Sequence, residues 1–96
     1  MKLENKVAIV TGGSRGIGYA TVEKFIKEGA KVCLTASSEA SAEKAVGKLK
    51  EAYPNADIMG IAPTLSSLES VQAEFAKVVE KYGRIDILIN NAGMSE

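Results

Sequence analysis

Residues 7–18 read Val7-Ala8-Ile9-Val10-Thr11-Gly12-Gly13-Ser14-Arg15-Gly16-Ile17-Gly18. The apolar residues at the start predict a buried strand, and the glycine-rich stretch after them leads directly into a pattern with helical spacing. A strand, a glycine-rich loop and a helix N-terminus in this order bring free backbone N–H groups and the positive end of a helix dipole to one point. We therefore interpret the stretch as the phosphate-binding part of a dinucleotide site.

The glycines of this loop have separate predicted tasks. Gly12 lets the chain leave the strand in a tight turn, at φ values that a Cβ penalises, while Gly16 and Gly18 let the backbone or the helix approach a ligand or a neighbouring strand closely. Their spacing is Gly-x-x-x-Gly-x-Gly, so the better-known Gly-x-Gly-x-x-Gly fingerprint is not satisfied. The alternative is a flexible surface loop, but the position after a strand rich in Val and Ile favours a binding site.

Three further strand patterns follow the first, with a helix pattern before each. We predict strands over residues 6–11, 31–36, 57–62 and 85–90. Strands that alternate with helices imply right-handed parallel crossovers. The expected fold is α/β, a Rossmann-like, doubly wound parallel sheet that binds ligands at the carboxyl ends of its strands.

Each of the three helices is expected to bury one apolar stripe. Gly29 and Gly83 are predicted to cap the first and third helices at their C-terminal ends. Ser66 stands three residues before Glu69, which is the spacing of a capping box at the start of the third helix. The stripes are Ile17, Ala20, Thr21 and Phe25 in the first helix, Ala42, Ala45, Val46, Leu49 and Tyr53 in the second, and Leu68, Val71, Phe75, Val78, Val79 and Tyr82 in the third.

Length and composition exclude several classes of protein. Ninety-six residues form at most one small domain, and 12 basic residues cancel 12 acidic ones, so neither a nucleic acid nor an anionic membrane is an expected partner. Cys33 lies alone in an apolar run, which predicts a buried structural thiol in a reducing compartment, and a chain without histidine suggests no metal site. No stretch has the ~18 apolar residues of a membrane span, and the start lacks a secretory pattern, so we expect a cytoplasmic protein.

A second motif, Asn90-Asn91-Ala92-Gly93, lies near the other end of the chain. Together with the stretch from Thr11 to Gly18, and with the strand and helix patterns between them in the expected order, it makes the chain resemble the short-chain dehydrogenase/reductase family. The resemblance covers essentially the whole chain but only the first part of the family's usual length. It implies the strand order 3-2-1-4, in which the loops after the first and fourth strands meet at one site.

The end of the second strand bears on the choice of nucleotide. Proteins of this fold that prefer NAD usually place a carboxylate there, but Ala36 occupies the position and Ser37 and Ser38 follow it. Arg15 stands where similar NADP-preferring members carry a basic residue, and a guanidinium suits phosphate geometry. We therefore predict NADP(H) as the cofactor. In the alternative, Arg15 is a solvated charge and the serines only cap the next helix.

The other cofactor contacts are implied by the resemblance. Similar proteins often have an Asp and an apolar residue after the third strand, where this chain has Thr64 and Leu65, so the adenine contact is expected through the backbone. The last motif is expected to form an Asx-type turn, and its small residues are expected to let the chain approach the cofactor ribose. The full predicted set of cofactor-binding residues is Gly12, Ser14, Arg15, Gly16, Ile17, Gly18, Ser37, Ser38, Thr64, Leu65, Asn91, Ala92 and Gly93.

Catalytic residues are not expected within this chain. Hydride transfer in the family relies on a serine and on a tyrosine and a lysine spaced Tyr-x-x-x-Lys, but Tyr19, Tyr53 and Tyr82 are each followed four residues later by Glu or Asp. We expect residues 1–96 to be the N-terminal, dinucleotide-binding part of a single Rossmann-like domain that continues beyond Glu96.

The expected function is that of an NADP-dependent oxidoreductase that interconverts a ketone and a secondary alcohol. The turn at residues 35–39 is most similar to that of bacterial 3-oxoacyl-[acyl-carrier-protein] reductases, which suggests a 3-oxoacyl thioester and a role in fatty acid biosynthesis. Hydroxysteroid and sugar-alcohol dehydrogenases of the same family stay open. So does a non-catalytic nucleotide-binding half-domain. The resemblance also implies that the full-length protein is a homo-oligomer.

Overall fold

The structure is a computed structural model that describes residues 3–14, 16–63 and 67–90. Strands and helices alternate as predicted, although each strand is one or two residues shorter than expected. The elements in chain order are β1 (Val7–Thr11), α1 (Gly16–Lys27), β2 (Lys31–Thr35), α2 (Glu39–Ala52), β3 (Ile58–Ile61), α3 (Leu68–Tyr82) and β4 (Ile87–Asn90).

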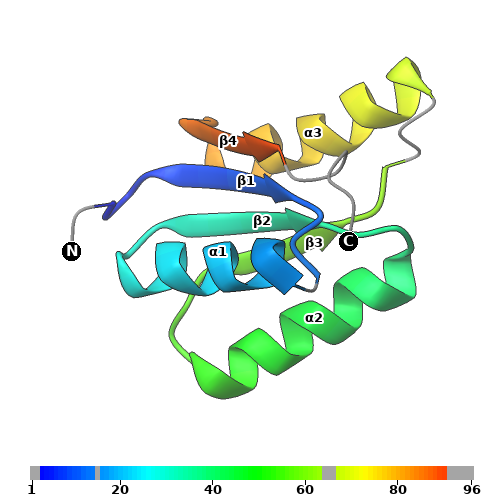
Figure 1. Ribbon diagram of the computed structural model, residues 1–96. Coiled ribbons are helices and arrows are strands. Elements are labelled where there is room, and N and C mark those ends of the chain that lie inside the picture. The colour runs from blue at the N-terminus through cyan, green and yellow to red at the C-terminus, as the bar shows by residue number, and fades with distance from the viewer. Residues whose placement is uncertain (1–2, 15, 64–66, 91–96) are drawn as a thin grey trace.

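The four strands form one parallel sheet in the order β3-β2-β1-β4, which confirms the expected topology (Figure 1). Ala8 of β1 is paired with Val32 of β2 on one side and with Ile87 of β4 on the other. All five residues of β1 are buried, because this strand lies inside the sheet and is covered on both faces. The carboxyl ends of β1, β2 and β4 therefore lie side by side at one edge of the sheet.

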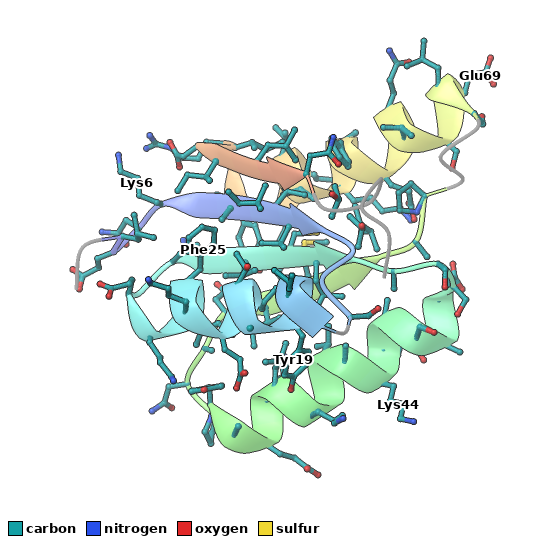
Figure 2. All side chains as sticks on the ribbon, viewed as in Figure 1. Lys6, Tyr19, Phe25, Lys44 and Glu69 are labelled. Atoms are coloured by element: carbon teal, nitrogen blue, oxygen red, sulfur yellow. The ribbon has the colours of Figure 1, made fainter. Side chains whose placement is uncertain are left out.

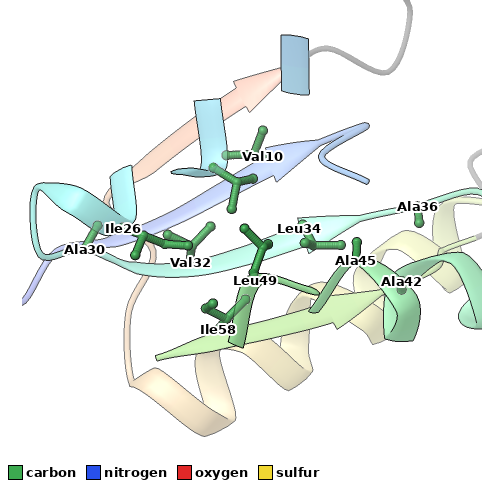
Figure 3. Packing of buried hydrophobic residues seen from close by; sticks show 11 residues of the cluster. Val10, Ile26, Ala30, Val32, Leu34, Ala36, Ala42, Ala45, Leu49 and Ile58 are labelled. Atoms are coloured by element: carbon green, nitrogen blue, oxygen red, sulfur yellow. The ribbon is translucent and has the colours of Figure 1, made fainter. Parts of the chain in front are cut away.

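Helices cover both faces of the sheet (Figure 1). α1 and α2 lie on one face and α3 lies on the other. Because side chains alternate along a strand, β2 contributes Val32 and Leu34 to the first face and Cys33 to the second. The first cluster (Figure 3) contains Val10, Val22, Ile26, Ala30, Val32, Leu34, Ala36, Ala42, Ala45, Leu49 and Ile58, and the second contains Val7, Ile9, Cys33, Ile61 and Val78.

α1 buries a different stripe from the one expected. Gly18, Val22 and Ile26 are the buried residues, whereas Ile17 is 66% exposed and Ala20 is exposed as well. The expected stripe followed the apolar side chains, but the helix is oriented by a close contact at Gly18, which carries no side chain. In α2 the expected stripe is correct, since Ala42, Ala45 and Leu49 are all buried. Lys44, by contrast, points away from the sheet (Figure 2).

α3 begins and ends at a cap. Ser67 is the N-cap, and its hydroxyl accepts a hydrogen bond from the Ser70 N–H at 3.2 Å, so the predicted capping position was one residue too early. Gly83 ends the helix with φ 82°, as expected. Within the predicted stripe only Val78 is fully buried, while Leu68 is 72% exposed because the first turn projects beyond the strands (Figure 2).

No helix among the described residues is long and apolar enough to cross a membrane.

Candidate nucleotide-binding site

Two glycines between β1 and α1 have a backbone conformation that other residues rarely adopt. Gly12 has φ 67° and Gly16 has φ 62°, both in the left-handed region that a Cβ penalises. The prediction for Gly12 is thus confirmed. A residue with a Cβ would be strained at Gly16 for the same reason. This requirement favours glycine there, in addition to the close approach that was predicted.

Gly18 allows α1 to pack directly on the loop that precedes it. A Cβ on Gly18 would lie 2.1 Å from the Gly12 carbonyl oxygen, which is closer than a Cβ comes to other atoms in proteins. It would also lie 3.1 Å from the Gly13 Cα, which is a tight contact. Gly13, which is not among the predicted site residues, is packed against β2, because a Cβ there would lie 2.8 Å from the Leu34 Cβ. The loop is therefore held between the helix and the sheet.

Thr35, the last residue of β2, holds the loop through two hydrogen bonds. The Gly12 N–H donates to the Thr35 hydroxyl oxygen at 3.0 Å, and the Gly13 N–H donates to the Thr35 carbonyl oxygen at 3.0 Å. Thr35 is buried, with 4% of its surface exposed. Sequence reasoning missed this residue.

The ends of β1 and β4 are joined in a similar way. The Thr11 hydroxyl donates to Asn90 Oδ1 at 3.0 Å and lies 3.3 Å from the Ile89 carbonyl oxygen. The two predicted motifs therefore begin at neighbouring strand ends. The signal that could have identified both threonines is that the apolar strands VAIVT and KVCLT each end in one.

The turn after β2 carries no carboxylate before Glu39. Ala36 is buried and Ser37 is exposed. Ser38 is the N-cap of α2: its oxygen accepts from the Ser41 N–H at 3.1 Å, and its hydroxyl lies 3.1 Å from Ser41 Oγ. Ser38 therefore does cap the helix, as the alternative interpretation held. Its contact with a cofactor stays a prediction.

The structure brings together some of the predicted contacts and leaves others outside the described residues. Gly12, Ser14, Gly16, Ile17 and Gly18 lie in the β1–α1 loop and the first turn of α1, at the same edge of the sheet as Ser37 and Ser38. Those outside the described residues are Arg15, Thr64, Leu65, Asn91, Ala92 and Gly93.

The first turn of α1 has the chemistry that a phosphate group requires. The first N–H groups of a helix have no partner within the helix, and the helix dipole is positive there. α1 has no acidic residue in its first turn, whereas α2 has Glu39 and α3 has Glu69 at that place. Two glycines with positive φ complete a cradle with no Cβ at these positions. The residues present therefore fit a bound phosphate.

Two of the ionisable groups with shifted pKa values lie at the amino ends of the strands. The N–H of Val7 donates to the Asp86 carboxylate at 2.8 Å, and with the Arg84 side chain it lowers the pKa of that carboxyl. Burial, with a hydrogen bond to Asp57, raises the pKa of Tyr82. Among the described residues no group of three or more Cys, Asp or Glu side chains is arranged to hold a metal ion.

A parallel sheet in the order 3-2-1-4 with a glycine-rich loop at the centre defines a Rossmann-type nucleotide-binding protein. Residues 6–96 match the family model for short chain dehydrogenase, and the chain belongs to the short-chain dehydrogenase/reductase family. Members of this family are oxidoreductases that use nicotinamide cofactors.

Two curated relatives show how far the similarity extends. The chain is 51% identical over 96 residues to the 3alpha-hydroxysteroid dehydrogenase of Mediterraneibacter gnavus, and these residues are 100% of this chain and 38% of the relative. It is 41% identical over 95 residues to the 3-oxoacyl-[acyl-carrier-protein] reductase of Vibrio cholerae, covering 99% of this chain and 37% of that protein. The chain thus spans less than two fifths of the length of both relatives.

Two solved structures share the fold over nearly the whole chain. Glucose dehydrogenase of Caenorhabditis elegans, in its apo form, has a TM-score of 0.87 and 32% identity over 99% of this chain and 40% of its own. A variant of actinorhodin polyketide ketoreductase with NADPH has a TM-score of 0.84 and 36% identity over 92% of this chain and 33% of its own.

Proposed function

We propose that this chain forms the nucleotide-binding part of an oxidoreductase that interconverts a ketone and a secondary alcohol with NADP(H). The observation that carries the proposal is the cradle formed by the β1–α1 loop and the first turn of α1. This first turn contains no acidic residue. The cofactor's pyrophosphate would lie there. Membership of the family supports the reaction type.

The preference for NADP(H) rests on the end of β2. A carboxylate at this point would accept from the ribose 2′-hydroxyl of NAD and repel a 2′-phosphate. The chain has Ala36, Ser37 and Ser38 instead, and its glycine loop contains Arg15, whose guanidinium would suit the geometry of a 2′-phosphate. The NADPH in the polyketide ketoreductase structure is in line with this assignment.

The residues of this chain would hold the cofactor and not perform the proton transfer. When bound, NADPH supplies the hydride that reduces the carbonyl group. The loop glycines, Ser14 and Ile17 would hold its phosphates, the turn at Ser37 and Ser38 the 2′-phosphate, and Thr64 and Leu65 the adenine. The motif Asn91-Ala92-Gly93 would lie against the ribose. In these placements the residues bind the cofactor, and none of them is given a catalytic role.

Two substrate classes follow from the relatives. The 3alpha-hydroxysteroid dehydrogenase is 51% identical and the 3-oxoacyl-[acyl-carrier-protein] reductase is 41% identical. The higher identity makes a hydroxysteroid the first substrate to test and a 3-oxoacyl thioester the second. NADPH oxidation by the full-length protein with a steroid ketone, compared with an acetoacetyl thioester, distinguishes them.

A charge at Ser37 tests the cofactor assignment. In the full-length protein, Ser37→Asp places a carboxylate beside the proposed 2′-phosphate, while Ser37→Asn has a similar size without the charge. We expect Ser37→Asp to weaken NADPH binding by roughly tenfold, which is about 1.4 kcal/mol, and to leave NADH binding within about twofold. The exposed position of Ser37 makes both variants compatible with the fold.

The measurement is a fluorescence titration of each variant with NADPH and with NADH. Wild-type protein that binds NADH as tightly as NADPH contradicts the NADP(H) assignment. So does a Ser37→Asp variant with an unchanged ratio of the two dissociation constants.

A further inference from the structure

Two polar side chains are buried among the described residues, Thr11 with 7% and Thr35 with 4% of the surface exposed. They occupy the last positions of neighbouring strands, β1 and β2. Parallel strands covered on both faces are usually apolar throughout, and a buried hydroxyl destabilises a protein unless it is hydrogen-bonded. A buried threonine at each strand end therefore calls for a specific partner.

The partner of Thr35 is the glycine loop. Its hydroxyl oxygen accepts from the Gly12 N–H and its carbonyl oxygen accepts from the Gly13 N–H, both at 3.0 Å. One residue of β2 therefore holds two consecutive amides of a loop that leaves β1. Valine at this position would keep the volume and the strand propensity but would leave the Gly12 N–H without this acceptor.

Thr35 also lies between the two ends of the proposed cofactor site. On one side it holds the loop that precedes α1. On the other side the chain continues at once into Ala36, whose N–H donates to the Ile61 carbonyl oxygen at 3.0 Å, and then into Ser37. Thr35 is therefore hydrogen-bonded to the loop of the phosphate cradle and lies two residues before Ser37 in the chain.

We propose that Thr35 is a positioning residue for the nucleotide: its hydroxyl holds the glycine loop in the position that lets the first turn of α1 contact the cofactor phosphates. This inference rests on the proposed function. Because the pyrophosphate is common to both nicotinamide cofactors, loss of the hydroxyl weakens the binding of NADPH and NADH alike. A change at Ser37, by contrast, acts on NADPH alone.

The test compares Thr35→Val with Thr35→Ser in the full-length protein. We expect Thr35→Val to raise the dissociation constants of NADPH and NADH by about tenfold each, with their ratio unchanged. Thr35→Ser retains the hydroxyl, so it restores both constants to within about threefold of wild type. In the nucleotide-free protein, Thr35→Val is expected to speed amide hydrogen exchange at Gly12 by about tenfold.

Val32→Ala is the control for a general loss of stability. Val32 is buried at the other end of β2, away from the loop, so this variant lowers the melting temperature without touching Gly12. Equal losses of nucleotide affinity in Val32→Ala and Thr35→Val would overturn the proposal, and so would unchanged affinity in Thr35→Val. If the wild-type protein bound neither nucleotide, both the proposed function and the positioning role would be wrong. If the wild-type protein bound a nucleotide but Thr35→Val bound it equally well, only the positioning role would be wrong.

Discussion

Gly18→Ala gives a direct measure of how closely α1 approaches the loop before it. The new Cβ would lie 2.1 Å from the Gly12 carbonyl oxygen, whereas ordinary contact begins at 3.4 Å, so the shortfall is 3.4 − 2.1 = 1.3 Å. The obstacle is backbone, which no side-chain rotation can move away. The helix and the loop must separate for alanine to fit.

The expected magnitude follows from two opposing effects. Alanine in a helix interior is favoured over glycine by about 1 kcal/mol. Overpacking typically costs ~1–3 kcal/mol, and a backbone obstacle places this site at the upper end. We therefore expect Gly18→Ala to lower the free energy of unfolding by about 2 kcal/mol. Loss of one amide hydrogen bond to a charged phosphate, worth ~1.5–3 kcal/mol, is expected to weaken NADPH binding by at least about tenfold.

Gly47→Ala is the matched control, because it makes the same substitution inside another helix. A Cβ on Gly47 meets no atom within 4 Å, so only the helix preference remains and the variant should be more stable by about 0.5–1 kcal/mol. Urea denaturation gives both free energies, and a fluorescence titration gives the affinity for NADPH. If Gly18→Ala were as stable as Gly47→Ala and bound NADPH like wild type, the close contact would not exist and the reasoning would be refuted.

Three further predictions concern other parts of the chain. The pKa of Asp86 is lowered first by the Val7 N–H and then by Arg84, so its carboxylate stabilises the fold above about pH 4, and this stabilisation is lost as the pH falls through the lowered pKa. In Asp86→Asn the free energy of unfolding should therefore depend less on pH between about 2 and 5. An unchanged pH dependence in this range would contradict the prediction. Burial raises the pKa of the Cys33 thiol to about 12, so a thiol reagent at pH 8 should label it in urea but not in the native protein, as mass spectrometry would show. Gly83→Ala should lower the unfolding free energy by about 1 kcal/mol through strain alone, since φ is 82° and a Cβ would meet no atom within 4 Å; Gly83→Asn, which tolerates this conformation better, should lose less.

The features that sequence predicted well are those fixed by local chemistry. Continuous apolar runs identify the buried strands β1 and β2, and Gly12, Gly29 and Gly83 lie at positive φ as the turn and cap positions require. The strand order followed from the resemblance, and the sheet confirms it. The strands and the positive-φ glycines depend on a few neighbouring residues, so a short window of sequence contains the information for them.

The features that sequence missed depend on contacts between distant parts of the chain. Ile17 was assigned to the buried stripe for its side chain, but the position of Gly18 against the Gly12 carbonyl turns another face of α1 inward. Thr35 looked like an ordinary β-branched strand residue, and its hydrogen-bond partner lies 23 residues away.

The central place of β1 has a consequence for how the chain is made. β1 pairs with β4 across 79 residues, so one of its edges stays open until residues 87–90 have been synthesised. From residue 35, where β2 is complete, to residue 90 is 90 − 35 = 55 residues, which takes roughly 3–11 s at ~5–20 residues per second. During those seconds the growing polypeptide presents an apolar strand edge of the kind that aggregates. Shielding of the nascent chain by the ribosome surface or a chaperone is thus most needed before β4 emerges.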